Sequence, residues 1–190
     1  MFDLDKYLAD LILNCQSAFG ERLLYMGLQG SWLRGEAHEN SDIDIMVILD
    51  GFSVRDMDTY REILKEIGFY ERSCGFICGM DEFSKWNPLE ICHVLHSTRD
   101  YFGVLSELVP CCTDADVRNF VKLSLNNLYH EICHRYIHSG AQRSAEALPA
   151  VYKGTFFILQ NLHYLRTGRF IGTKAQLLAQ LEGADRAVLT

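Results

Sequence analysis

The segment Ile43–Leu49 (IDIMVIL) constrains the fold of this chain more than any other part of its sequence. It is almost continuously apolar and rich in β-branched residues, a pattern typical of a central strand that is buried on both faces. A shorter apolar run at residues 23–28 is followed by small residues, which predicts a second buried strand that leads into a tight turn. We therefore expect a sheet with these two strands at its centre.

Helical patterns flank the two strands. Apolar residues recur at helical spacing over residues 3–19 and again over residues 55–67, and Pro88 is placed to begin a helix that runs to about Ser97. A less regular segment predicts a further strand near Gly75–Cys78. Because helix and strand alternate over the first ~105 residues, this part of the chain is expected to form a small α/β sheet.

The pattern becomes helical after Pro110. Thr113 is a good N-cap for a long helix that runs to about His138, where Ser139 and Gly140 end it. Pro149 is expected to open another helix that runs to about Thr167, and Thr173 to cap a short third one. We predict an α+β chain, with a small mixed β-sheet domain and flanking helices over residues 1–108 and an all-α helical-bundle domain over residues 109–190.

The composition limits the classes of partner that the chain is expected to bind. Eighteen Lys and Arg residues against 25 Asp and Glu residues give a net charge of −7, which disfavours non-specific binding to nucleic acid or anionic lipid. No apolar run approaches the ~20 residues that span a bilayer, and the N-terminus is acidic where a signal peptide would be basic. The odd count of seven cysteines argues against a disulfide framework. We expect a cytoplasmic protein without a membrane partner, and a homodimer stays open.

Two carboxylates stand together at the start of the central strand. Asp42 and Asp44 are two residues apart, so strand geometry places both side chains on the same face and Ile43 on the other. Adjacent carboxylates repel each other unless a positive charge lies between them. Oxygen ligands at this spacing suit Mg²⁺ or Mn²⁺, which often bridge protein carboxylates and substrate phosphates.

Gly30 and Ser31 follow directly on the first strand. A glycine there allows the backbone to approach a ligand closely, and the following N–H groups and the hydroxyl can hold phosphate oxygens. Such a phosphate cradle beside a carboxylate pair is a layout for metal-assisted phosphoryl or nucleotidyl transfer. The alternative interpretation is a simple turn, with aspartates that only end a strand.

The motif closely resembles that of the DNA polymerase β-like nucleotidyltransferase superfamily, and more narrowly of its small bacterial members related to aminoglycoside nucleotidyltransferases. The family pattern is an apolar strand, then GSxxxG, then SDxD at the start of another apolar strand, and residues 20–50 match each element. The helical part resembles the helical domains that follow the catalytic domain in this superfamily, by element order and by the segment LHYLRTGRFIGTK.

The resemblance implies roles for individual residues. Gly30 and Ser31 would bind the nucleoside triphosphate, and Arg34 could assist, although a surface position suits Arg34 equally well. Apart from the resemblance, Lys153 or Lys174 of the helical part could meet the triphosphate as a point charge, with a solvated surface position as the alternative for each. The catalytic residues Asp42 and Asp44 would bind the metals. The reaction implied is transfer of a nucleoside monophosphate, AMP from ATP, to a hydroxyl of a small-molecule acceptor, with Mg²⁺ or Mn²⁺ as cofactor and pyrophosphate as product.

The sequence departs from the family pattern at one position. A third carboxylate is expected on the next strand, but the segment GFICGMDEF has Gly, Cys and Phe there, with Asp81 and Glu82 just beyond. Asp81 is the first candidate for the third metal ligand, and Glu131 of the helical part is another. If none of them reaches, the chain is a weakly active or non-catalytic, antitoxin-like nucleotide-binding protein.

The segment His130–His134 (HEICH) matches HExxH, the spacing that places two zinc ligands on one face of a helix. A zinc protease is therefore a remote alternative, which would need a third ligand and a substrate cleft. The plainer interpretation is a helix with histidines along a groove or a surface stripe.

Overall fold

The computed structural model describes residues 2–190, which divide into two compact units. The first unit comprises the chain up to Asn87 together with Ser97–Cys111, and the second comprises Pro88–His96 and Cys112–Thr190. The predicted boundary near residue 108 lies close to the last crossing between the units. The helix at residues 88–96 differs from the prediction, because it groups with the second unit and not with the sheet.

A four-stranded mixed sheet forms the centre of the first unit, in the order β3-β2-β1-β4. The strands are β1 (Leu23–Leu28), β2 (Ile43–Leu49), β3 (Ser73–Gly79) and β4 (Arg99–Phe102). The inner strands β1 and β2 run antiparallel, β2 and β3 run parallel, and β4 pairs antiparallel with β1. The sequence pattern did not predict β4, because its short RDYF segment lacks an apolar run.

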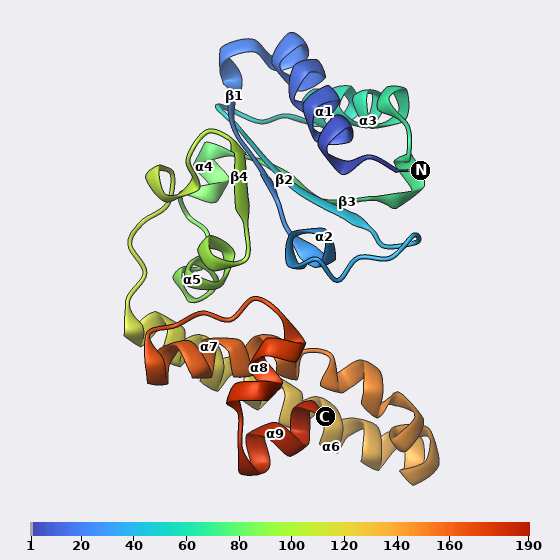
Figure 1. Ribbon diagram of the computed structural model, residues 1–190, viewed down its shortest axis with the longest axis vertical. Helices are drawn as coiled ribbons and strands as arrows, with labels where there is room; N and C mark the ends of the chain where they lie inside the picture. The colour runs from blue at the N-terminus through green and yellow to red at the C-terminus, as the bar shows by residue number, and fades with distance from the viewer. Residues whose placement is uncertain (1) are drawn as a thin grey trace. The chain divides into compact units, whose positions relative to one another are not determined.

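Helices α1 (Leu4–Phe19) and α3 (Val54–Ile67) cover one face of this sheet (Figure 1). Their apolar stripes pack against side chains that alternate along the inner strands. The shared core consists mainly of Leu8, Leu11, Cys15, Leu28, Ile43, Ile45, Val47, Tyr60 and Ile63. Since Ile43, Ile45 and Val47 face this core, the residues between them, including Asp44, face the opposite side.

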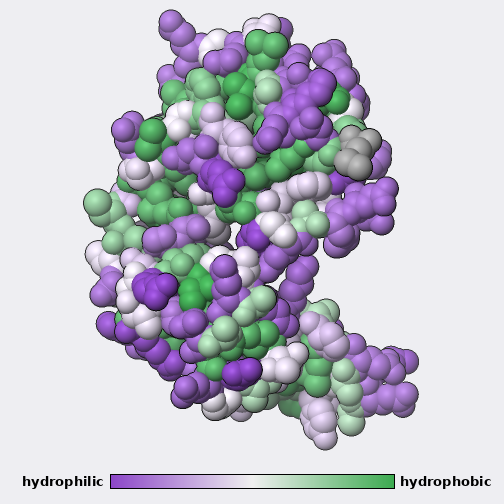
Figure 2. Space-filling view, viewed as in Figure 1, coloured by the Kyte–Doolittle hydropathy of each residue, from purple (hydrophilic) through white to green (hydrophobic). Residues whose placement is uncertain are grey.

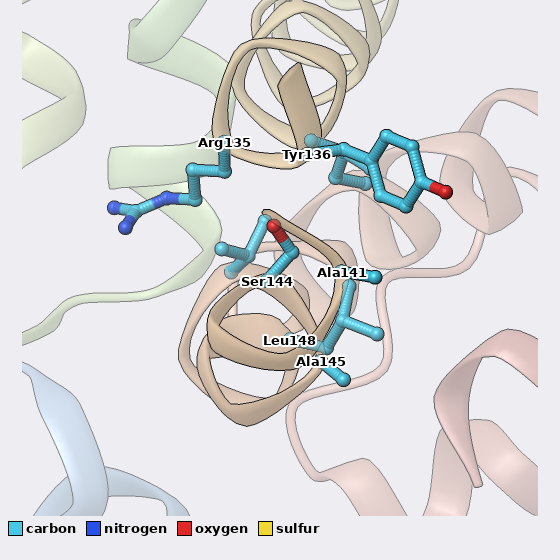
Figure 3. Close-up of a pocket in the computed structure, with 8 residues that line it drawn as sticks. Arg135, Tyr136, Ala141, Ser144, Ala145 and Leu148 are labelled. Carbon is cyan, nitrogen blue, oxygen red and sulfur yellow. The ribbon is translucent and has the colours of Figure 1, made fainter. Parts of the chain in front are cut away.

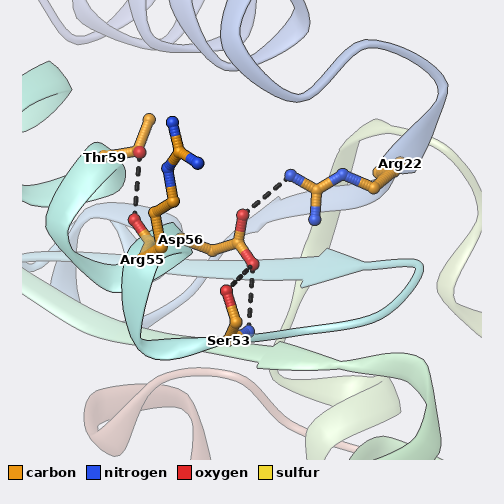
Figure 4. Close-up of polar contacts among 5 residues, drawn as sticks. All are labelled: Arg22, Ser53, Arg55, Asp56 and Thr59. Atoms are coloured by element: carbon orange, nitrogen blue, oxygen red, sulfur yellow. Dashed lines mark hydrogen bonds and ion pairs between the residues drawn. The ribbon is translucent and has the colours of Figure 1, made fainter.

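A polar network fixes the start of α3 to the chain just before β1 (Figure 4). Asp56 accepts hydrogen bonds from the backbone N–H and the hydroxyl of the N-cap residue Ser53, at 2.9 and 2.7 Å. Its other oxygen accepts from Nη2 of Arg22 at 2.7 Å. These three bonds hold the pKa of Asp56 at about 2, with the bond to Arg22 as the largest cause. Asp56 therefore stays charged although it is buried.

Short elements complete the first unit. They are the helices α2 (Gly30–Arg34) and α4 (Met80–Phe83) and the 3₁₀ turns η1 (Gly20–Arg22), η2 (Tyr70–Arg72) and η3 (Leu105–Glu107). The connection from β2 through α3 to β3 joins neighbouring parallel strands, which is the usual function of a crossover helix. As a result, β2 and β3 begin at the same end of the sheet, with Ile43 opposite Ser73.

The second unit is helical. It contains α5 (Pro88–His96), α6 (Asp114–Tyr152), α7 (Thr155–Thr167), α8 (Lys174–Gln180) and α9 (Gly183–Leu189). Thr113 caps α6 as predicted, and its hydroxyl accepts a hydrogen bond from the N–H of Asp116. The expected break at Gly140 is present, with a φ of 77°. Helical structure resumes at once, however, so that Pro149 lies inside α6 and does not open a helix.

The surface is largely hydrophilic on the face drawn in Figure 2, with apolar side chains between the hydrophilic ones. Within residues 2–190, no helix combines the length and apolar character that a membrane span requires. The seven cysteines all belong to this part of the chain, and each is a free thiol.

Candidate active site

The carboxylate pair lies where the sequence predicts it. Ile43 is fully buried under α1 and α3, so Asp42 and Asp44 project from the other face of the sheet. Asp42 is exposed and Asp44 is half-buried. The turn before them is fixed by Ser41, whose hydroxyl accepts from the N–H of His38 at 2.9 Å. Both carboxylates are thus held at one edge of a rigid strand and remain accessible.

Gly30 lies directly against the second carboxylate. Its φ is +70°, and a Cβ atom built on it would overlap the Oδ2 oxygen of Asp44. The N–H of Gln29 donates to the carbonyl oxygen of Asp44 at 2.8 Å, which fixes the end of β1 beside the start of β2. Only glycine provides both the backbone angle and the room. The sequence-predicted turn and carboxylate pair are therefore in direct contact.

Ser31 occupies the first turn of α2, which begins at Gly30. The first backbone N–H groups of a helix have no partner within the helix, so they are donors for an incoming anion. The structure therefore brings together four predicted residues: Gly30, Ser31, Asp42 and Asp44. Backbone N–H donors and carboxylate acceptors therefore lie next to one another at a single edge of the sheet.

The two cationic residues predicted for nucleotide binding, Arg34 and Lys153, have different surroundings. Arg34, at the end of α2, donates through Nε to Glu36 Oε2 at 2.7 Å; its side chain is half-buried and Glu36 is exposed. Lys153 lies in the second unit, exposed at the end of α6. Its assignment to nucleotide binding stays a prediction.

The strand register separates Asp81 from the carboxylate pair. In the parallel β2–β3 pairing Asp44 lies opposite Cys74, whereas Leu49 lies opposite Gly79. Asp81 follows Gly79 in α4, so it lies beyond the far end of β3. Five residues of strand, roughly 17 Å at ~3.3 Å per residue, intervene even before α4 begins. The choice of Asp81 as the third metal ligand is therefore wrong, and Glu82 in the same helix is excluded for the same reason.

Cys74 is the residue that sequence reasoning missed. It is opposite Asp44 in the register, so the two side chains project from the same face of the sheet. The pKa of this thiol is raised, first by partial burial and further by the charges of Asp44 and Asp42, while a hydrogen bond from Gly75 opposes the shift. The signal was available in principle, because parallel strands joined by a crossover helix begin side by side.

The pair fits a hard divalent cation by its chemistry. Asp42 and Asp44 offer oxygen atoms only, and an exposed carboxylate beside a half-buried one leaves coordination positions for phosphate oxygens. Within residues 2–190, no three or more His, Cys, Asp or Glu side chains gather as a complete metal-binding group. A cation here would therefore depend on ligands from the nucleotide or from water.

The HExxH segment lies on α6. His130 and His134 have ring centroids 5.9 Å apart, and His134 and His138 have centroids 4.4 Å apart. Glu131 is engaged by Arg135 in an ion pair of 2.9 Å. All three histidines are exposed on one helix face. This arrangement corresponds to the plainer interpretation, a surface stripe of histidines.

A pocket of ~210 Å³ lies between the two segments of α6 on either side of Gly140 (Figure 3). Arg135 and Tyr136 come from the first segment, and Ala141, Ser144 and Leu148 from the second. Its walls are almost entirely apolar, and its one charged group, Arg135, is paired with Glu131. The pocket follows from the break in the helix and offers no reactive pair of side chains.

In the first unit, a mixed sheet carries a glycine turn packed against a strand-borne aspartate pair. The family model of the nucleotidyltransferase domain matches residues 15–77, which include both halves of the motif. The predicted likeness to the DNA polymerase β-like nucleotidyltransferases is thereby confirmed, and with it the α+β fold. This domain is characteristic of enzymes that transfer nucleotidyl groups.

Two known proteins illustrate the similarity. "Putative protein adenylyltransferase MJ1305" of Methanocaldococcus jannaschii is 34% identical over 64 residues, which cover 34% of this chain and 43% of that protein. The matched segment is thus less than half the length of this curated relative. The crystal structure of spectinomycin adenyltransferase AAD(9) from Enterococcus faecialis with ATP and spectinomycin aligns with a TM-score of 0.61 and 12% identity, over 98% of this chain and 87% of that chain. The second comparison shows a shared fold.

Proposed function

We propose that this chain is a metal-dependent adenylyltransferase, which moves AMP from ATP to a hydroxyl group of an acceptor. The observation that carries the proposal is the contact between Gly30 and the Asp44 carboxylate. This contact sets the glycine turn beside the carboxylate pair, so that donors for phosphate oxygens and ligands for a cation would lie together.

Different residues of the site bind the phosphates and the cation. The N–H groups at the start of α2 and the Ser31 hydroxyl hold phosphate oxygens of ATP, and Asp42 and Asp44 hold Mg²⁺ or Mn²⁺. A cation held by these carboxylates would supply charge neutralisation at the phosphates. The acceptor oxygen forms a bond to the α-phosphorus, the bond from that phosphorus to the bridging oxygen breaks, and pyrophosphate leaves. The hydroxyl proton passes to solvent or to a nearby base.

We propose a small molecule as the acceptor, in the cytoplasm. The fold shared with AAD(9), whose crystal structure contains ATP and spectinomycin, supports a small acceptor and ATP as the donor. The net charge of −7 favours an acceptor that is cationic or small over a long nucleic acid. A protein hydroxyl is a second candidate, favoured by the name of the Methanocaldococcus relative.

A non-catalytic nucleotide-binding protein is a different outcome, favoured by the lack of a third carboxylate beside Asp42 and Asp44 within residues 2–190. Nucleotide binding without pyrophosphate release from any acceptor would support it. Turnover with any acceptor would exclude it.

The first test titrates MgATP into the wild-type chain and into Asp42→Asn and Asp44→Asn by calorimetry. We expect metal-dependent binding in the wild type and at least a tenfold loss of affinity in each variant, because each removes a charged ligand of the cation. Asp81→Asn is the matched control, since its carboxylate lies beyond the far end of β3. Equal affinity in all four chains would contradict the site. Pyrophosphate release is then screened against small hydroxyl compounds and against protein extracts.

A further inference from the structure

Cys74 lies on the strand next to the aspartate pair, directly opposite Asp44. In a parallel pair, residues that face each other in register project to the same side of the sheet. Cys74 is opposite Asp44 in the parallel pairing of β2 with β3, so its side chain leaves the sheet beside that carboxylate. The side chain at position 74 therefore belongs to the same constellation as the two carboxylates.

The backbones of β3 and β2 lie very close together at Gly75. Gly75 has a φ of +105°, and a Cβ atom there would overlap the carbonyl oxygen of Ile45. This contact fixes the position of the preceding residue relative to Asp44. Cys74 is exposed, so its side chain is accessible from the side on which a nucleotide would bind.

A thiol differs from a carboxylate in the two properties that matter for Mg²⁺ and Mn²⁺. A neutral thiol adds no negative charge to balance a second cation. Sulfur is also a soft donor, whereas these cations take oxygen ligands.

We propose that Cys74 sets the number of cations in this centre. With a thiol at position 74, the aspartate pair and the nucleotide together hold one divalent cation, and a carboxylate at position 74 creates a second site. The inference rests on the proposed function, because it takes Asp42 and Asp44 as ligands. It adds a residue that controls the stoichiometry of the metal and thereby the rate of transfer.

The test counts Mn²⁺ on the full-length chain by electron paramagnetic resonance of free Mn²⁺, with a non-hydrolysable α,β-methylene analogue of ATP present. Wild type is compared with Cys74→Asp and with the matched control Cys74→Ser, which keeps the size of the side chain without adding a charge. We expect one Mn²⁺ per chain in the wild type and in Cys74→Ser. In Cys74→Asp we expect two.

Several outcomes would overturn the inference. One Mn²⁺ in all three chains would show that position 74 does not reach the centre, while the proposed function would stand. Two Mn²⁺ in the wild type, or a loss of Mn²⁺ in Cys74→Ser, would show that the centre is completed without a new carboxylate or through the thiol itself. No Mn²⁺ in any of the three chains would overturn the proposed function together with this inference.

A second measurement covers the case in which Cys74→Asp does not fold. Alkylation of Cys74 in the wild type is followed by peptide mass spectrometry, with and without Mn²⁺ and the ATP analogue. We expect bound Mn²⁺ and nucleotide to slow this alkylation at least tenfold, and Cys111, an exposed cysteine at the end of the first unit, to react unchanged. Unchanged alkylation of Cys74 in a chain that binds the nucleotide would place this residue outside the centre and overturn the inference.

Discussion

The Asp44 carboxylate occupies the space that any side chain at position 30 would need. Gly30 therefore does more than permit a turn: its missing side chain determines where a charged ligand can lie. Gly35, at the other end of the same short helix, has a similar φ of +69°, but open space surrounds the place where its Cβ would lie. The two glycines separate the effect of backbone strain from the effect of close contact.

Gly30→Ala is expected to displace Asp44 and to lower the affinity for MgATP at least tenfold. Both Gly30→Ala and the control Gly35→Ala should lose about 1–2 kcal/mol of stability, because alanine is strained at a positive φ. Only the first should lose nucleotide binding. Calorimetric titration and thermal unfolding of the two variants make the comparison. Normal MgATP binding by Gly30→Ala would contradict the site.

Asp56 makes a pH-dependent contribution to stability. Its pKa is about 2 in the folded chain, below the ~3.9 of an unfolded aspartate. Because the folded-state pKa is lowered, the stabilisation is complete above about pH 4 and is lost as the pH falls through 4 towards 2. Asp56→Asn should therefore cost about 1–2 kcal/mol at neutral pH.

Urea unfolding at pH 7 and pH 3 tests this expectation. The difference between wild type and Asp56→Asn should shrink at pH 3, where the unfolded carboxylate is protonated. Asp58→Asn is the control on the same helix, since Asp58 is exposed and its ion pair with Arg61 should contribute little. A cost for Asp56→Asn that does not change with pH would show that charge has no part in its effect.

The pairing of β2 with β3 depends on the missing side chain of Gly75. An alanine there would push its Cβ into the backbone of Ile45 on the neighbouring strand, which cannot move without breaking ladder hydrogen bonds. Gly75→Ala should lower the free energy of unfolding by about 2–4 kcal/mol, from strain at a positive φ and from overpacking. Urea unfolding measures this loss.

Gly51→Ala is the control for Gly75→Ala, because Gly51 also has a positive φ but open space around its Cβ position. It should cost only the strain, about 1–2 kcal/mol. Equal losses in the two variants would show that the strands can separate slightly at no cost. The register that excludes Asp81 from the carboxylate pair would then be less rigid than the contact indicates.

The chain passes between the two units more than once. Helix α5 lies between two segments of the sheet unit in sequence but packs with the helical unit. His93 on α5 stacks on Phe120 with centroids 6.1 Å apart, and its Nδ1 lies 3.1 Å from Nδ2 of Asn161. A cut near residue 108 therefore separates α5 from the helices that bury its apolar residues.

A fragment of residues 1–111 is accordingly expected to aggregate or to unfold well below the temperature of the full chain. Replacing residues 88–96 by a Gly/Ser linker of equal length should restore its solubility, because the exposed apolar helix is removed. Thermal unfolding and size-exclusion chromatography compare the two fragments. A soluble fragment that retains α5 would show that this helix belongs with the sheet.

Much of the first unit followed from local sequence patterns. The apolar run at residues 43–49 predicted one inner strand, and the run that ends in the glycine turn at residue 30 predicted the other. The alternation of side chains along a strand predicted that Asp42 and Asp44 share a face. These features depend only on residues that are close in sequence. The capping of α6 by Thr113 is also a local feature. Strand β4 escaped prediction because its four residues, RDYF, carry no distinct pattern.

The sequence by itself determined the carboxylate pair, the turn beside it and the helical character of the second half of the chain. The tertiary structure alone decided which residue of β3 lies opposite Asp44, because that depends on the parallel register of β3 against β2. It also assigned α5 to the helical unit and showed that Pro149 lies within a helix. In the first two cases the deciding contact joins residues far apart in sequence, and such contacts leave no signal in a local pattern.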